Sequence, residues 1–168
     1  IVKPPNAAAA AFGGFTIAPP VGGLQRYKIG GDLRLALLIP EFEISTPAAR
    51  RVLPDKIPLQ DAVFSAGCVA AISAAFATGN YRDLAGCFED GLHQPYREPL
   101  IPFLSPVIKA ARKAGALGGW LSGSGSTIAC ATLKNPENVA DAMIAASGLD
   151  AAVAVVLSAD NAGVRILP

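Results

Sequence analysis

The sequence predicts an α+β fold of the split βαβ type, in which helices cover one face of an antiparallel sheet. The chain has 168 residues, the size of one domain, and its 52% hydrophobic against 16% charged residues favours a filled core over disorder. The run at 33–40 is short and almost continuously apolar, as in a buried strand. From that run onward the expected order is strand, several helices, strand, strand, helix and strand.

Before that strand, the start of the chain is predicted to form a helix and a hairpin. Residues 6–12 are rich in alanine and precede a glycine pair, which favours a helix that ends there. Two short strands at 15–18 and 25–29 are joined by a Pro/Gly turn. The run Gly30-Gly31-Asp32 then breaks the pattern.

The connection after the first buried strand is long and is expected to be helical. A short helix should begin at Ser45 or Thr46, either of which can cap it, with Pro47 at its first position. The next helix is long, ends at Gly79, and carries apolar residues at spacings of three and four, which is typical of one inward face. These residues are Leu59, Val63, Ala66, Val69, Ile72 and Phe76.

The remaining elements complete the sheet and its helices. A helix is expected at 80–90, and prolines delay the following one until about residue 105, where Val107, Ile108 and Ala111 face inward. Asn135-Pro136 starts the last helix. The remaining strands are expected at 116–121, 127–133, 151–157 and 164–167. This order predicts a ferredoxin-like sheet.

Charge and cysteine content exclude several classes of function. The 14 basic and 13 acidic residues give a net charge of +1, which leaves no basic excess for nucleic acid. No uninterrupted apolar run approaches the ~20 residues of a membrane span. Cys68, Cys87 and Cys130 are far apart and His93 is the only histidine, so neither a metal site nor a disulfide framework is expected. A reducing, cytoplasmic compartment follows.

The segment Ser122-Gly123-Ser124-Gly125-Ser126-Thr127 is the strongest local feature. Alternating glycine and serine allow positive φ angles and expose N–H and hydroxyl donors, which suits contact with a phosphate. The segment has no lysine and joins two strands, which excludes a Walker loop. A plain flexible hairpin is an equally good interpretation.

Two arginine-containing segments are candidates for anion binding. Thr46 and Arg50 are four residues apart, so both lie on one face at the start of a helix, where N–H groups and a guanidinium bind carboxylate or phosphate. Alternatively, Thr46 is a cap and Arg50 a solvated charge. In the polar cluster His93-Gln94-Pro95-Tyr96-Arg97, Arg97 is a second candidate clamp. One histidine leaves no nucleophile–base pair, and no carboxylate spacing indicates an acid–base pair.

Three segments in order carry a family resemblance: PEFEISTPAARRVLP, DGLHQPYREPLIP and GGWLSGSGSTIACA. Together they resemble the C-terminal part of the homoserine kinase family, within the GHMP superfamily of small-molecule kinases. The GGF near the start and the DNAGVRIL ending are similar too, so the resemblance covers essentially the whole chain. The T-x-x-A-R and H-x-x-Y-R-x-x-L-I-P segments are its more specific motifs.

The resemblance implies an enzyme that transfers the γ-phosphate of ATP, with Mg²⁺, to the hydroxyl of L-homoserine in threonine biosynthesis, as a homodimer. It implies that Arg50 and Arg97 bind the carboxylate end of the amino acid. It also implies that Thr46 lies close to the phosphoryl-transfer centre, and that 122–127 is the family's third motif, which packs beside the phosphate-binding loop. Catalysis by positioning and charge stabilisation fits a site without an obvious base.

Departures from the family concern its phosphate-binding half. The Pro-x-x-x-Gly-Leu-Gly-Ser-Ser type loop and the acidic metal-side residue are absent from these 168 residues. Lys3-Pro4-Pro5-Asn6 stands where homoserine kinases usually read His-Pro-Asp-Asn. We therefore expect 1–32 to be the remnant of an N-terminal GHMP kinase domain and 33–168 to be the C-terminal domain, inactive on its own.

Other interpretations stay open at this point. One is a different GHMP kinase, of the mevalonate or archaeal shikimate type; the two-arginine pattern favours a carboxylate-bearing substrate, which shikimate also is. Another is a non-catalytic, amino-acid-binding ferredoxin-like module, which the missing ATP loop permits. A third is a structural pairing domain, because an apolar sheet surface can mediate dimers.

Overall fold

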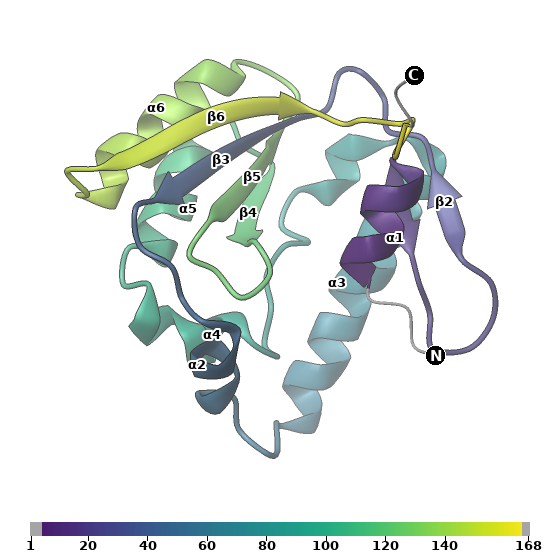
Figure 1. Cartoon of the computed structure of the whole chain (residues 1–168), viewed down its shortest axis with the longest axis horizontal. Helices are drawn as coiled ribbons and strands as arrows, with labels where there is room; N and C mark the ends of the chain where they lie inside the picture. Colours follow the sequence, from purple (N-terminus) through teal and green to yellow (C-terminus); the bar gives the residue numbers. More distant parts are fainter. Residues whose placement is uncertain (1–4, 166–168) are drawn as a thin grey trace.

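The structure is a computed structural model that describes residues 5–165 (Figure 1). Its helices and strands, with two 3₁₀ segments labelled η, follow one another along the chain. They are α1 (Pro5–Phe12), β1 (Phe15–Ile17), β2 (Gln25–Tyr27), β3 (Arg34–Pro40), α2 (Thr46–Arg51), α3 (Leu59–Thr78), η1 (Tyr81–Leu84), α4 (Gln94–Arg97), η2 (Glu98–Leu100), α5 (Leu104–Lys113), β4 (Gly118–Leu121), β5 (Ile128–Thr132), α6 (Pro136–Ser147) and β6 (Ala152–Ser158).

A four-stranded antiparallel sheet lies at the centre, with strand order β4-β5-β3-β6. β3 pairs with both β5 and β6, so that Arg34 lies opposite Thr132 on one side and Ser158 on the other. Helices connect β3 to β4 and β5 to β6, which is the split βαβ order. The predicted α+β fold is therefore confirmed.

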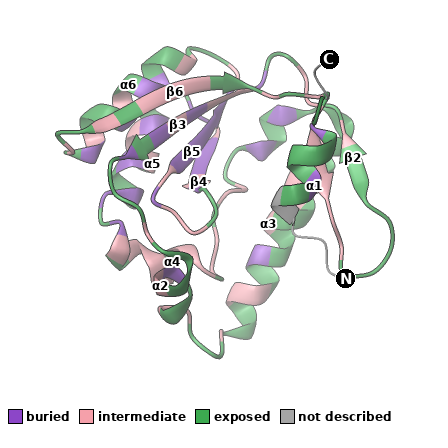
Figure 2. Ribbon diagram, in the orientation of Figure 1, coloured by how far each residue is buried: buried purple, intermediate pink, exposed green. Residues whose placement is uncertain are grey.

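The main core lies between the sheet and helices α5 and α6. Val107 of α5 and Val139 and Met143 of α6 are fully buried there with Leu38 of β3. Figure 2 shows the buried residues concentrated on the inner strands and on the inward sides of these two helices. Successive strand residues point to opposite faces, so Ala131 of β5, next to Cys130 of the main core, lies in a second, smaller core. Leu33, just before β3, joins this core with η1 and the C-terminal part of α3.

Helix α3 has the predicted length, but most of its predicted inward face lies in solvent. Leu59 is 80% exposed, Val63 64% and Val69 61%, whereas Ile72 and Phe76 pack against the second core. The expectation that Leu59, Val63 and Val69 face inward was wrong, because the first half of α3 turns another side to the rest of the chain. Ser65 lies on that side: it is buried, and its hydroxyl accepts from the N–H of Gly91 (3.1 Å). By length and composition alone α3 could cross a membrane, although one helix of this kind is a weak indication of a span.

Two other expected elements differ from the structure. The segment 80–90 is not a helix: it forms η1 and then turns at Gly86, whose φ of +79° is incompatible with a continuing helix. The expected last strand at 164–167 is absent at 164 and 165, and its remaining positions lie outside the described residues.

The N-terminal elements are bonded to the segment that follows β6. The side chain of Asn161 accepts from the N–H of Ile29 (2.8 Å) and donates to its carbonyl (2.9 Å). The N–H of Gly14 donates to the carbonyl of Asp160 (2.8 Å). Gly163 has a φ of +77° and lies so close to the backbone of α1 that a Cβ would be 2.4 Å from the carbonyl oxygen of Ala11. Residues 160–163 therefore pack with α1 and the hairpin.

Candidate functional site

Helix α2 carries two of the predicted site residues on its exposed surface. Ser45 is the N-cap, and its hydroxyl accepts from the N–H of Ala48 (3.3 Å). Thr46 is thus the first residue of the helix and not its cap, and with Pro47 beside it the helix start is well defined. Thr46 and Arg50 are both exposed, whereas Ala49 is fully buried and fixes the helix to the chain.

A carboxylate holds the polar cluster that follows α3. Asp90 accepts from the N–H groups of Leu92 (2.7 Å), His93 (3.0 Å) and Gln94 (2.7 Å), which orders the start of α4. Burial raises the pKa of Asp90, but these backbone donors and His93 outweigh it and hold the pKa below its ordinary 3.8. Asp90 is therefore an ionised anchor of the cluster.

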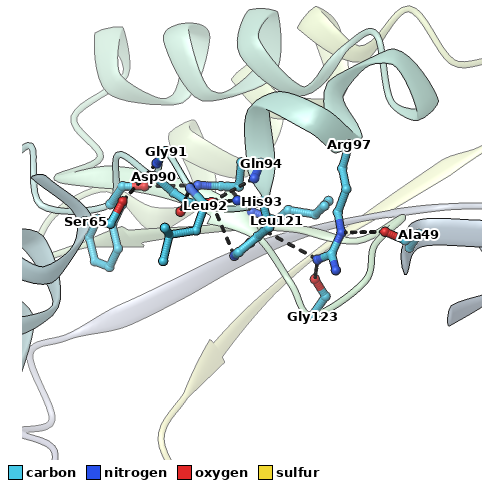
Figure 3. Close-up of polar contacts among 11 residues, drawn as sticks. Ala49, Ser65, Asp90, Gly91, Leu92, His93, Gln94, Arg97, Leu121 and Gly123 are labelled. Atoms are coloured by element: carbon cyan, nitrogen blue, oxygen red, sulfur yellow. Dashed lines mark hydrogen bonds and ion pairs between the residues drawn. The ribbon is translucent and has the colours of Figure 1, made fainter. Parts of the chain in front are cut away.

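Arg97 connects α4 to the two other predicted segments (Figure 3). Its Nε donates to the carbonyl of Ala49 in α2 (3.1 Å), and its Nη1 donates to the carbonyl of Gly123 in the glycine-rich turn (2.9 Å). These partners are 48 and 26 residues away in sequence. The structure thus brings α2, α4 and the turn together around one guanidinium.

His93 lies between Asp90 and Arg97. Its Nε2 is 3.4 Å from the Asp90 carboxylate, and its Nδ1 is 3.4 Å from Nη1 of Arg97. Burial lowers the pKa of His93 below its ordinary 6.5; Asp90 opposes this change and Arg97 adds to it. A neutral His93 ring can therefore form hydrogen bonds with the Asp90 carboxylate on one side and the Arg97 guanidinium on the other.

The glycine-rich turn at 122–127 joins β4 to β5 and is held at both ends. The N–H of Ser122 donates to the carbonyl of Thr127 (2.9 Å), and the buried Ser126 hydroxyl donates to the carbonyl of Phe42, just before α2. Gly125 has a φ of +91°, and a Cβ there would lie 2.8 Å from Cδ1 of Ile101. The turn is an ordered, packed element, which disfavours the plain flexible hairpin.

No motif in the sequence singles out Gln94, yet both the oxygen and the nitrogen of its side-chain amide form hydrogen bonds. Oε1 accepts from the N–H of Leu121 (2.7 Å), the residue before the turn, and Nε2 donates to the carbonyl of Phe88 (3.2 Å). The ring of Phe88 stacks on Trp120 of β4 at 4.5 Å. Asp90 and Gln94 could be recognised in the sequence as polar residues, but their backbone partners could not.

A cavity of about 570 Å³ lies beside this cluster, between the sheet, α3 and the N-terminal elements. Its lining is mostly apolar, with Phe15, Ile72, Phe76 and Trp120 among the contributors, and His93 and Asp90 form part of its polar edge. The stacked rings of Phe15 and Phe76, 4.0 Å apart, close one side.

The acidic, histidine and cysteine side chains do not assemble into a metal site. Across residues 5–165, no three of them converge. No chemical step is assigned to a metal ion on these residues. The Lys3-Pro4-Pro5-Asn6 segment, which departs from the expected pattern, begins outside the described residues.

Comparison with protein families matches residues 62–148 to the family described as GHMP kinases C terminal. The homoserine kinase of Aquifex aeolicus is 41% identical over 170 residues, which span 97% of this chain and 57% of that protein. The homoserine kinase of Moorella thermoacetica is 42% identical over 146 residues, 85% of this chain and 49% of that protein. The chain thus spans about half the length of these relatives.

Solved structures show the same arrangement. The homoserine kinase from Cytophaga hutchinsonii superposes with a TM-score of 0.86 at 27% identity, covering 93% of this chain and 51% of that one. The L. major mevalonate kinase in complex with R-mevalonate has a TM-score of 0.65 at 15% identity, covering 95% and 54%, and shares the fold.

Proposed function

Because this chain belongs to the GHMP kinase family, as its motifs predicted, we propose that its complete gene product is a homoserine kinase. The reaction transfers the γ-phosphate of ATP to L-homoserine: the hydroxyl oxygen bonds to the γ-phosphorus, the bond from that phosphorus to the ADP oxygen breaks, and the hydroxyl proton is released to water. Support comes from relatives of that name at 41% and 42% identity. The same relatives are about twice as long, so we propose this chain as the C-terminal part of the enzyme.

The contact that carries the proposal is the bridge made by Arg97. A guanidinium fixed between α2 and the glycine-rich turn has a set direction, and its Nη2 forms no hydrogen bond within residues 5–165. We propose that this group and the exposed Arg50 bind the substrate carboxylate, since a guanidinium fork matches a carboxylate in shape and charge. Thr46, one helical turn before Arg50, would then lie near the reacting hydroxyl.

The glycine-rich turn is proposed to support the phosphates of ATP. Within residues 5–165 the hydroxyls of Ser122 and Ser124 form no hydrogen bonds, so both are free to donate. Such donors bind the phosphate oxygens without a lysine. These residues bind and orient; the remaining phosphate contacts are expected from a part of the enzyme that resembles the family's Gly-Leu-Gly-Ser-Ser loop.

The direct test is ADP release by the complete gene product with ATP and a panel of small alcohols. We expect L-homoserine to be phosphorylated in preference to mevalonate and shikimate, and we expect no turnover by the 168 residues alone. Preference for another alcohol would overturn the substrate. Turnover by the 168 residues would contradict their proposed place as part of the enzyme.

Arg50 provides a sharper test, because Arg51 is a matched control on the same helix. Losing a charged hydrogen-bond partner costs about 1.5–3 kcal/mol, so Arg50→Met should raise KM for homoserine by about 10- to 150-fold. KM for ATP should change little. Arg51→Met, also an exposed residue of α2, should resemble wild type; equal effects of the two variants would remove Arg50 from the substrate site.

Two further properties are proposed from the family resemblance. The enzyme is expected to be cytoplasmic, and the three free thiols of Cys68, Cys87 and Cys130 support a reducing compartment. It is also expected to be a homodimer in solution. Light scattering coupled to size exclusion measures this directly, and a monomeric mass at micromolar concentration would contradict it.

A further inference from the structure

We propose that Gln94 is a positioning residue that fixes the glycine-rich turn at 122–127 against α4. This assignment rests on the proposed function for its effect on catalysis, because the turn matters there as a support for ATP. The structural part of the proposal concerns two hydrogen bonds and is testable without any activity.

The first step is the place of Leu121 in the sheet. β4 is an edge strand, so every second N–H along it points away from β5. Ser122 donates to Thr127 across the hairpin, and Leu121 therefore points its N–H outward. Gln94 accepts that N–H at 2.7 Å. Gln94 thus holds the last outward N–H before the turn begins.

The second step is that this position requires an amide. Oε1 accepts from Leu121 while Nε2 donates to Phe88, so the side chain must offer one acceptor and one donor at the same reach. A glutamate accepts but cannot donate when ionised, and a methionine of similar length does neither well. The chain therefore uses the chemical character of glutamine and not only its size.

The third step is the rigidity of the element that carries Gln94. Asp90 orders the start of α4 through three backbone N–H groups. Arg97 lies three residues after Gln94, on the same side of one helical turn, and holds the carbonyl of Gly123. Helix α4 therefore holds the glycine-rich segment 122–127 at two backbone positions: Leu121, just before the segment, and Gly123, within it. Neither contact uses a side chain of the glycine-rich segment, so the hydroxyls of Ser122 and Ser124 stay free for a ligand.

Amide hydrogen exchange in the complete gene product tests the bond directly. In Gln94→Met the N–H of Leu121 should exchange about tenfold faster, the effect of losing a hydrogen bond worth about 1 kcal/mol or slightly more. Gln60→Met is the matched control, because Gln60 is exposed at the start of α3, and it should match wild type. Unchanged exchange at Leu121 in Gln94→Met would overturn the proposal.

Gln94→Glu separates the two bonds and also serves if Gln94→Met fails to fold. This variant keeps the acceptor for the N–H of Leu121 and loses the donor to the carbonyl of Phe88. The exchange rate of the Leu121 N–H should therefore stay closer to that of wild type than in Gln94→Met. Protonating the introduced carboxyl at acidic pH restores a donor. The difference in Leu121 exchange rate between Gln94→Glu and wild type should then become smaller. A Glu variant whose Leu121 is as unprotected as in denaturant would contradict the assignment.

Kinetics then test the consequence for the reaction. A displaced turn should raise KM for ATP several-fold in Gln94→Met while KM for homoserine changes less, and Gln94→Glu should partly rescue it. A loss of kcat alone, with both KM values unchanged, is the sign of fewer folded molecules and would overturn the positioning role. If wild type shows no kinase activity, the proposed function fails, and the exchange measurement still decides the role of Gln94.

Discussion

The guanidinium of Arg97 donates to the carbonyl oxygen of Gly123 across 2.9 Å. Its Nε reaches the carbonyl of Ala49 as well. Arg97 is thus first of all a structural connection between segments that are distant in sequence. The proposed binding of a substrate carboxylate by Arg97 gains from this arrangement, since a side chain that is already fixed loses little conformational freedom on binding.

Removing this connection should destabilise the chain. Arg97→Met leaves two backbone carbonyls without a charged donor, and we expect the free energy of unfolding to fall by about 1–3 kcal/mol. Urea denaturation followed by circular dichroism measures the loss. Arg82→Met, at an exposed arginine of η1, should stay within about 0.5 kcal/mol of wild type. Equal stability of the two variants would show that the Arg97 contacts contribute nothing.

The two glycines of the turn should respond differently to alanine. Gly123 has a φ of +60° with no atom near a new Cβ, so Gly123→Ala should cost about 1 kcal/mol. Gly125 adopts a φ of +91°, and its new Cβ would press on the buried Ile101 and Leu121, so Gly125→Ala should cost about 2–4 kcal/mol. The ranking is checked by the same urea titrations, and the reverse order would mean that the turn adopts another conformation.

The free energy of unfolding should decrease as the pH falls through 6.5, the ordinary pKa of a histidine, because of His93. Burial lowers its pKa in the folded chain, so the unfolded chain, with a pKa near the ordinary 6.5, binds the proton first as the pH falls. His93→Gln should weaken this dependence. Because His93 is the only histidine, one NMR ring signal reports its titration, and a measured pKa at or above 6.5 would contradict the assignment.

Cys130 should resist alkylation in the folded chain. It is fully buried, and burial raises the pKa of its thiol to about 12, with Arg112 opposing. Iodoacetamide at pH 8 should therefore modify the partly exposed Cys87 while leaving Cys130 unmodified until denaturant is added. Peptide mass spectrometry distinguishes the two sites. Rapid labelling of Cys130 under native conditions would show that the sheet opens readily around β5.

Much of the fold could be predicted because its signals are local. Ser45 and Pro47 mark the start of α2, Gly79 ends α3, and the apolar run of β3 is the length of one buried strand. The buried side of α3 could not be predicted, because alanines occupy much of its surface and Leu59 and Val63 fit an inward face as well as an outward one. Which side of α3 is buried depends on the distant segments that pack against it, and the sequence of the helix alone does not specify them.

The site was less predictable than the fold for a different reason. The sequence indicates arginines and a glycine-rich turn as site residues, but the contacts that join these segments are made to backbone atoms. Arg97, Gln94 and Ser126 all bond to main-chain atoms of distant segments. A carbonyl belongs to every residue type, so the sequence carries no mark of such a partner.

The packing of residues 160–163 on the N-terminal elements has a mechanical consequence. The chain passes between the α1–hairpin unit and the sheet twice, just before β3 and just after β6. These crossings are neighbours, since Arg34 and Ser158 are paired in the sheet. A further contact lies away from these crossings, because the ring of Phe15 in β1 stacks on Phe76 of α3 at 4.0 Å. The α1–hairpin unit is therefore joined to the sheet through two neighbouring segments and to α3 through an aromatic pair, so that the two ends of the described chain are held in one packed body.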